Sequence, residues 1–147
     1  MTERETVAGE EAGRTIEKMV EFAAPIDRVW RAITDPQELS QWFGHETELE
    51  LVPGGNGAMI WEQHGSFAVR VEVVEPPHRF VWSWVHEAGV PFDDAPSTRV
   101  EWTLTAREDG GTTLHLRESG FRTELHFQQN TEGWGEELDE LIALLAA

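Results

Sequence analysis

The stretch that decides the fold is Arg79-Phe80-Val81-Trp82-Ser83-Trp84-Val85. Phe80, Trp82 and Trp84 recur with period two, which predicts a β-strand with these three aromatic rings on one face. The chain has seven Trp and seven Phe in 147 residues and no Tyr. A large aromatic side chain buries about 150–250 Å², so a small domain needs few of them as filling. The set favours a strand that forms the wall of an apolar pocket. A packed core remains the alternative for any single ring.

Further strand-like segments lie on both sides of this stretch. Apolar residues alternate with polar ones at 16–22, 47–51, 58–63, 66–74, 98–107 and 112–119. In the fourth segment Phe67, Val69, Val71 and Val73 are expected to share one face. The Asp109-Gly110-Gly111 sequence predicts a hairpin turn between the last two strands.

Three segments have helical spacing instead. Pro25 is suited to the first turn of a helix over 25–34, and Asp35 is suited to capping a second short helix that ends at Gly44. The longest helix is predicted over about 123–145. Gly133 and Gly135 weaken that helix and are expected to mark a kink or a close approach to the sheet.

This order of elements predicts an α+β fold with a curved antiparallel sheet of about six to seven strands around a long C-terminal helix. Two short helices follow the first strand. An antiparallel sheet with one apolar face needs a cover, and the terminal helix supplies it. We expect residues 1–13 to be a flexible tail and residues 14–147 to form a single domain.

Composition limits the possible partners. The formal charge is −17, which disfavours nucleic acid and anionic membranes as partners. The absence of cysteine excludes disulfides and thiolate metal sites, and the six histidines are scattered without ligand spacing, so no metal and no cofactor are expected. The sequence has no apolar run long enough to span a membrane and no apolar signal segment. We therefore predict a cytoplasmic protein, monomeric or homodimeric.

Four stretches together resemble the SRPBCC (START-like, helix-grip) superfamily. Within it, the chain is most similar to the group named for homology to the activator of the heat-shock-protein-90 ATPase. The stretches are 24–43 with its Trp-Arg-Ala-Ile-Thr-Asp-Pro run, Pro53-Gly54-Gly55, 74–84 from Val-Glu-Pro-Pro to the tryptophans, and 111–141. The resemblance implies the helix-grip fold with a deep hydrophobic cavity between the sheet and the long helix. Members include ligand-binding proteins and polyketide cyclases. This chain has Glu118 where the family motif often has His.

Aromatic residues and a few polar ones are the candidate ligand-binding set. An apolar pocket with a few polar anchors is the usual form of a small-molecule site. The predicted set is Trp42, Phe43, Trp61, Phe67, Phe80, Trp82, Trp84, Trp102, Leu116, Glu118, Phe127, Asn130 and Trp134.

Glu118 is the one catalytic candidate, because it shares strand parity with Leu114 and Leu116. A carboxyl group that faces a cavity has a raised pKa through desolvation and can act as acid or base. The alternatives are a solvated strand end or an ion pair with Arg. No nucleophile motif, P-loop or dinucleotide-binding pattern occurs.

Three functions remain open at this point. The first is binding of a small hydrophobic molecule, lipid-like or aromatic, without a catalytic motif. The second is an enzyme resembling a polyketide cyclase or hydrolase that uses Glu118 as acid–base. The third is a co-chaperone-like module that binds another protein and would need an exposed apolar patch.

Overall fold

The structure is a computed structural model, and it describes residues 14–44 and 46–146. The predicted tail at 1–13 lies outside the described residues. Within these described residues, seven strands and three α-helices follow one another, with a 3-10 turn, η1, before β6. They are β1 (Ile16–Phe22), α2 (Ile26–Thr34), α3 (Pro36–Trp42), β2 (Glu46–Leu49), β3 (Asn56–Trp61), β4 (Gly65–Glu75), β5 (Arg79–Val85), η1 (Phe92–Asp94), β6 (Ser97–Ala106), β7 (Thr112–Ser119) and α4 (Glu124–Ala146).

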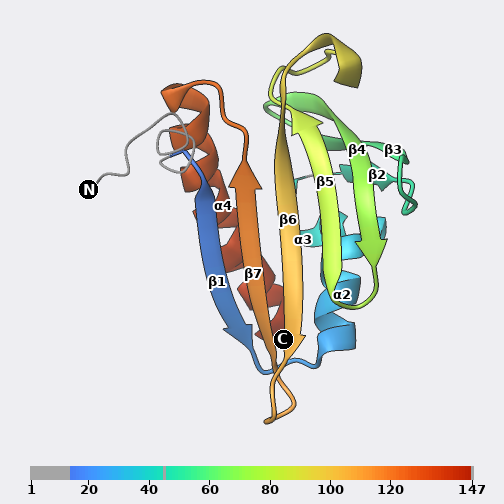
Figure 1. Cartoon of the computed structure of the whole chain (residues 1–147), viewed down its shortest axis with the longest axis vertical. Coiled ribbons are helices and arrows are strands. Elements are labelled where there is room, and N and C mark those ends of the chain that lie inside the picture. Colours follow the sequence, from blue (N-terminus) through green and yellow to red (C-terminus); the bar gives the residue numbers. More distant parts are fainter. Residues whose placement is uncertain (1–13, 45, 147) are drawn as a thin grey trace.

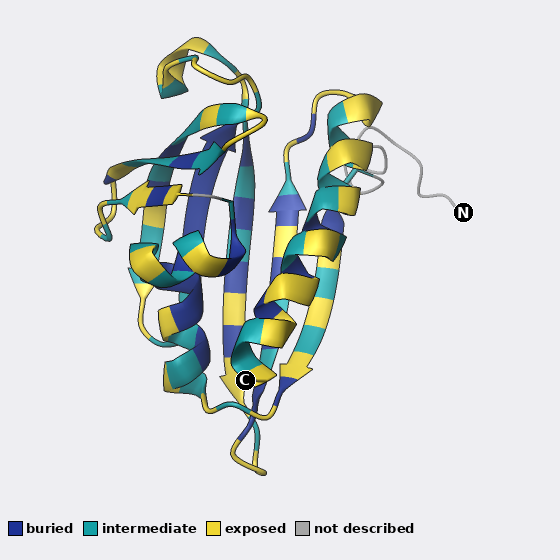
Figure 2. Ribbon diagram, turned by 180° about the vertical axis from the view of Figure 1, so that it is seen from behind, coloured by how far each residue is buried: buried dark blue, intermediate teal, exposed yellow. Residues whose placement is uncertain are grey.

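All strand pairs are antiparallel, in the order β1-β7-β6-β5-β4-β3-β2. β1 and β2 are consecutive in sequence but form opposite edges of the sheet. The α2–α3 segment therefore crosses one face to connect them, and α4 lies on that same face (Figure 1 and Figure 2). The α+β helix-grip prediction is confirmed, because a seven-stranded antiparallel sheet is covered by helices that include a long C-terminal one.

Local sequence signals set the helix boundaries. Pro25 takes the N-cap position with an extended backbone, and α2 begins at Ile26. Asp35 caps α3 by accepting a hydrogen bond from the backbone N–H of Gln37 at 2.9 Å, with Pro36 in the first turn. Gly44, whose φ is +75°, turns the chain from α3 toward β2.

The inner face of the sheet carries the hydrophobic core. Phe80, Trp82 and Trp84 project from β5 into it, as their alternation predicts. One strand departs from the prediction: the register of β4 shifts between Val71 and Val73, and Val74 packs against the core in place of Val73. An extra residue in one strand reverses the alternation beyond it, and period-two reasoning has no means of detecting that insertion.

Candidate functional site

A pocket with a volume of about 530 Å³ lies between α4 and the inner side of β3, β4 and β5. Its aromatic wall, as we call it, consists of Phe43, Trp61, Phe67, Trp84 and Trp134. The rings contact one another, with centroids 5.1 Å apart for Phe43–Trp61 and 5.2 Å apart for Phe43–Trp134. The space is therefore bounded on one side by a continuous aromatic surface.

The other side of this pocket is polar and comes mainly from α4. That helix contributes His126, Gln129, Asn130, Glu132, Gly133, Glu136 and Glu137, and His64, Val85 and His86 complete the lining. Apolar surface with a few polar groups is the general form of a small-molecule site.

Several predicted ligand-binding residues lie elsewhere. Trp82 and Trp102 are fully buried, their indole rings are 5.8 Å apart, and neither lines the pocket. Phe127 is half-buried and packs edge-on against Phe121 at 5.7 Å. The remaining predicted residues that are buried in the packed core are Trp42, Phe80 and Leu116. About half of the aromatic residues that were predicted to bind a ligand are therefore part of the closed core instead.

Glu118 is fully buried on β7, directly behind the aromatic wall. The indole N–H of Trp84 donates to its Oε2 at 2.8 Å, and the indole N–H of Trp134 donates to its Oε1 at 2.7 Å. The Asn130 amide donates to both oxygens at 3.1 Å, and the Thr98 hydroxyl donates to Oε2 at 2.5 Å. Glu118 is therefore neither a solvated residue at a strand end nor part of an ion pair with an arginine among the described residues.

Two opposing effects act on the ionisation of Glu118. Burial raises its pKa, because the charged form loses its water. The hydrogen bonds from Thr98, Trp84, Trp134 and Asn130 oppose this rise, since an indole N–H can only donate and so favours the acceptor-only carboxylate. Desolvation is the larger effect, so the pKa stays above its ordinary value.

Thr98 links this buried carboxyl group to the pocket. Its Oγ1 lies 2.6 Å from Nε2 of His86, and that Nε2 is 3.8 Å from Oε2 of Glu118. Burial, reinforced by the neighbouring His126, lowers the pKa of His86 to about 4. The rings of His86 and His126 stack with centroids 5.3 Å apart. An uncharged imidazole therefore stands between the pocket and the Thr98–Glu118 pair.

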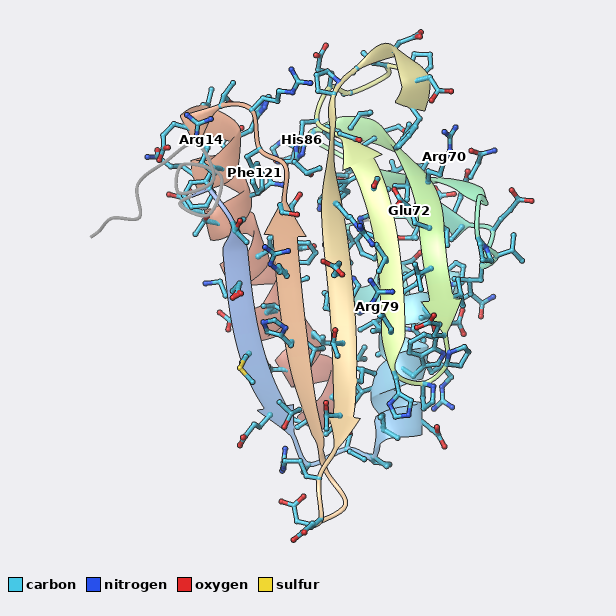
Figure 3. The ribbon with its side chains drawn as sticks, viewed as in Figure 1. Arg14, Arg70, Glu72, Arg79, His86 and Phe121 are labelled. Carbon is cyan, nitrogen blue, oxygen red and sulfur yellow. The ribbon has the colours of Figure 1, made fainter. Side chains whose placement is uncertain are left out.

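His86 also borders a second cavity. This smaller space, of about 220 Å³, is lined by residues of the β5–β6 connection, the start of β6, the β7–α4 turn and the first turn of α4, among them Thr98, Phe121 and His126. Figure 3 shows His86 next to Phe121 at that end of the sheet, away from Arg79 and Glu72. His86 and His126 line both cavities.

Glu137 is an unusual carboxyl group in the lining of the pocket itself. It is half-buried and accepts a hydrogen bond from the backbone N–H of Gly44 at 3.2 Å. Burial raises its pKa to about 7, and the nearby carboxylates of Glu140 and Glu136 add to the rise, against the hydrogen bonds from Gly44 and the Trp61 indole. It therefore carries only part of a negative charge near neutral pH.

Sequence reasoning did not select His86 or Glu137 as ligand-binding residues, although the signals were present. His86 continues the alternation of Phe80, Trp82 and Trp84 and so belongs to the same face. Glu137 follows Asn130 and Trp134 at helical spacing and so belongs to their side of α4. In the part of the chain that is described, no three His, Asp or Glu side chains gather as a metal site, and no helix is long and apolar enough to cross a membrane.

Comparisons with known proteins support the fold described above. A family model described as "Activator of Hsp90 ATPase homolog 1-like protein" matches residues 23–146. None of the curated proteins compared with the chain matches it.

Three solved structures illustrate the likeness. DynU16, a protein of the dynemicin biosynthetic locus, is 29% identical with a TM-score of 0.77; the alignment covers 91% of this chain but only 48% of DynU16. CalU16 from Micromonospora echinospora is 33% identical with a TM-score of 0.71, over 86% of this chain and 73% of that one. Protein MLL2253 from Mesorhizobium loti is 24% identical with a TM-score of 0.79, over 90% and 96%, and shares the fold.

Proposed function

The chain belongs to the Activator of Hsp90 ATPase homolog 1-like family within the SRPBCC superfamily, and from that premise we propose that it binds a small hydrophobic molecule, aromatic or lipid-like. The proposed site is the pocket between α4 and the sheet. The observation that carries the proposal is the aromatic wall around a space of about 530 Å³. That volume lies within the usual range for small-molecule sites, about 300–1,000 Å³.

The aromatic wall supplies the affinity in this proposal. Burial of about 200 Å² of apolar ligand surface contributes about 5 kcal/mol before the costs of association. Asn130 supplies orientation: its amide nitrogen donates to Glu118, which leaves its carbonyl oxygen to accept a hydrogen bond from the ligand. The similarity to DynU16, from a biosynthetic locus, supports a small organic molecule as the ligand.

A titration with the neutral fluorescent probe N-phenylnaphthylamine tests this proposal. Saturable binding of one probe per chain is expected, with quenching of Trp emission. Trp61→Leu removes part of the aromatic wall and is expected to weaken binding about tenfold.

Trp30→Leu is the matched control, because Trp30 packs on Phe80 at 6.2 Å and does not line the pocket. Its affinity for the probe is expected to equal that of the wild type. Equal weakening by both substitutions, or no saturable binding at all, contradicts the proposal.

Acid–base catalysis is a second candidate, favoured by the His86–Thr98–Glu118 contacts. With Glu118 ionised, Thr98 donates to it and accepts from Nε2–H of His86. This arrangement orients the imidazole and, since the pKa of His86 is about 4, leaves its other ring nitrogen unprotonated near neutral pH as a weak base that can accept a proton transiently from a ligand. Acetylnaphthalene in deuterated water is the test, since α-deuterium exchange above the protein-free rate is expected.

Thr98→Val removes the connecting hydroxyl group while preserving the shape of the side chain. It is expected to abolish the exchange and to leave probe binding intact. Exchange by the wild type at the protein-free rate excludes this second candidate.

No observation favours the co-chaperone-like alternative. The exposed large hydrophobic side chains of the described residues are Met19, Val52, Leu125 and Ile142. They lie on three separate segments, and the two on α4 are about 25 Å apart along the helix. They form no contiguous patch of the kind that a partner protein would cover.

A further inference from the structure

The charges around the pocket have a single sign. Glu137 lies in the lining, and Glu132 and Glu136 form its exposed rim on the same helix. None of the described residues that line the pocket is a lysine or an arginine. The pocket therefore presents negative potential to any ligand, and the formal charge of −17 on the whole chain reinforces it.

The aromatic wall complements these carboxylates. Indole and phenyl faces carry negative electrostatic potential, and Trp is the strongest of the natural aromatic partners for a cation. Trp61 contacts Phe67 at 5.8 Å and Trp84 at 6.0 Å between ring centroids, and all three rings line the pocket. The Trp61 side chain also lies close enough to Glu137 to lower the pKa of that carboxyl group, so an aromatic ring and a carboxyl group are adjacent at one point of the wall.

We propose that this pocket selects a hydrophobic cation, an amine with an aromatic or alkyl body, over neutral and anionic molecules of the same shape. The inference rests on the proposed function and names the ligand class for the same site. In this arrangement the apolar body packs on the rings of Phe43, Phe67 and Trp84. The ammonium group lies between the Trp61 face and Glu137, with Glu132 and Glu136 attracting it from the rim.

Glu137 gives the inference a second readout. The titratable groups that act on Glu137 are Glu136 and Glu140, and it accepts a hydrogen bond from Gly44 N–H, with a smaller contribution from the Trp61 side chain. Near neutral pH it is partly protonated, because its pKa is about 7. An ammonium group beside it stabilises the carboxylate, so binding of an amine is expected to release protons to the buffer, whereas binding of a neutral molecule is not.

Three probes of one shape and different charge test the inference: phenylbutylamine, phenylbutanol and phenylbutyrate. Isothermal titration calorimetry of each probe, in buffers of different ionisation enthalpy, gives both affinity and proton release. The amine is expected to bind about tenfold more tightly than the alcohol and to release protons. The carboxylate is expected to bind more weakly than the alcohol.

Glu137→Gln separates the charge effect from the packing effect. It is expected to weaken binding of the amine about tenfold and to change binding of the alcohol much less, so that the preference for the amine over the alcohol falls. The matched control is Asp139→Asn, which removes one carboxylate from an exposed position of α4 outside the pocket lining. It is expected to change neither affinity.

The outcomes distinguish the two proposals. Alcohol binding equal to or tighter than amine binding overturns the cation inference and leaves the hydrophobic site standing. Equal effects of Glu137→Gln and Asp139→Asn on the amine also overturn it, because the selectivity would then come from overall charge. If neither N-phenylnaphthylamine nor any of the three probes binds, both proposals fail.

Discussion

Glu118 occupies a position on β7 where its neighbours on the inner face, Leu114 and Leu116, are apolar. A lone carboxyl group there would be strongly destabilising, since a buried charge needs partners. Four side chains from β5, β6 and α4 supply them. Glu118 therefore depends on the correct packing of three other elements, and each partner can be tested separately.

The contribution of one such partner is measurable with Trp134→Phe. The change removes the indole N–H that donates to Glu118 at 2.7 Å. Hydrogen bonds to charged groups contribute about 1.5–3 kcal/mol to stability. We expect the free energy of unfolding to fall by that amount, in addition to the stability lost with the packing of the larger ring.

The control for this substitution is Trp102→Phe. Trp102 is also buried, but its indole N–H has no hydrogen-bond partner among the described residues. Urea unfolding followed by circular dichroism should show Trp134→Phe to be more destabilising by about 2 kcal/mol. Equal losses would show that the bond to Glu118 contributes nothing net.

Glu137 makes stability depend on pH in a predictable direction. Between its ordinary pKa of 4.5 and its folded pKa of about 7, the folded chain holds a proton that the unfolded chain has released. Rising pH therefore destabilises the wild type in this window. Glu137→Gln lacks that loss, so its Tm should rise relative to the wild type from about pH 5 to about pH 7.5.

His86 titrates in the opposite sense, because its folded pKa of about 4 lies below its ordinary 6.5 and stability is lost as pH falls. That effect is common to the wild type and to Glu137→Gln, so it cancels in the difference between their Tm values. Asp139→Asn, at an exposed position, should show a difference that does not vary with pH in the same window. A flat difference for Glu137→Gln would contradict the raised pKa.

At the scale of elements, α4 carries two glycines that the sequence suggested would mark a kink or a contact with the sheet. A close approach to the sheet is absent from the described structure, because a Cβ added at Gly133 or Gly135 would meet no atom of another element within 4 Å. We predict that Gly135→Ala stabilises the protein by about 1 kcal/mol, the usual helix-propensity difference.

Thermal unfolding measures the effect of Gly135→Ala. Gly44→Ala serves as the opposite case in the same experiment. Gly44 has a φ of +75°, and a Cβ there would lie 3.0 Å from the Ile60 carbonyl oxygen. That substitution is expected to destabilise the protein by about 1 kcal/mol or more. Destabilisation by Gly135→Ala would indicate that the helix needs flexibility at this point.

Most element positions follow from local patterns. Alternation identified β5, β6 and β7, and helical spacing with the Asp35 cap identified α2, α3 and α4. The β4 bulge escaped prediction because a single inserted residue leaves no mark in a run of valines, where Val73 and Val74 are chemically equal.

The candidate site was less predictable than the fold. The alternation of residues along each strand predicts that Glu118 and the aromatic rings lie on the inner face of the sheet. It does not predict which rings fill the core and which line the pocket. That division depends on how far α4 stands from each strand, which sequence spacing does not encode. Thr98 and Asn130 donate hydrogen bonds to Glu118, and His86 lies 3.8 Å from it, across 12 or more positions of the sequence, so no local sequence motif predicts these contacts.

For the whole molecule, the excess of negative charge opposes compaction. With 28 acidic and 11 basic side chains, like charges repel more strongly in the folded state than in the expanded one. Salt screens this repulsion, with a Debye length of about 10 Å at 0.1 M.

We therefore expect the Tm to rise as sodium chloride increases from about 0.02 M to about 0.5 M. The rise should shrink near pH 4.6, the isoelectric point of the sequence. A Tm that falls with salt at neutral pH would mean that attractive ion pairs outweigh the repulsion.

The contacts between indole rings have one consequence for spectroscopy. Trp61 and Trp84 stand 6.0 Å apart, Trp84 and Trp82 stand 5.8 Å apart, and Trp102 continues the series to Trp42 at 6.1 Å and Trp134 at 5.5 Å. Excitation absorbed by any of these chromophores migrates rapidly to the others at such separations. A quencher bound beside Trp61 alone would therefore reduce the fluorescence of all these tryptophans. The steady-state signal shows that a molecule is bound but not where it is bound. Lifetime measurements on single-Trp variants are needed to locate it.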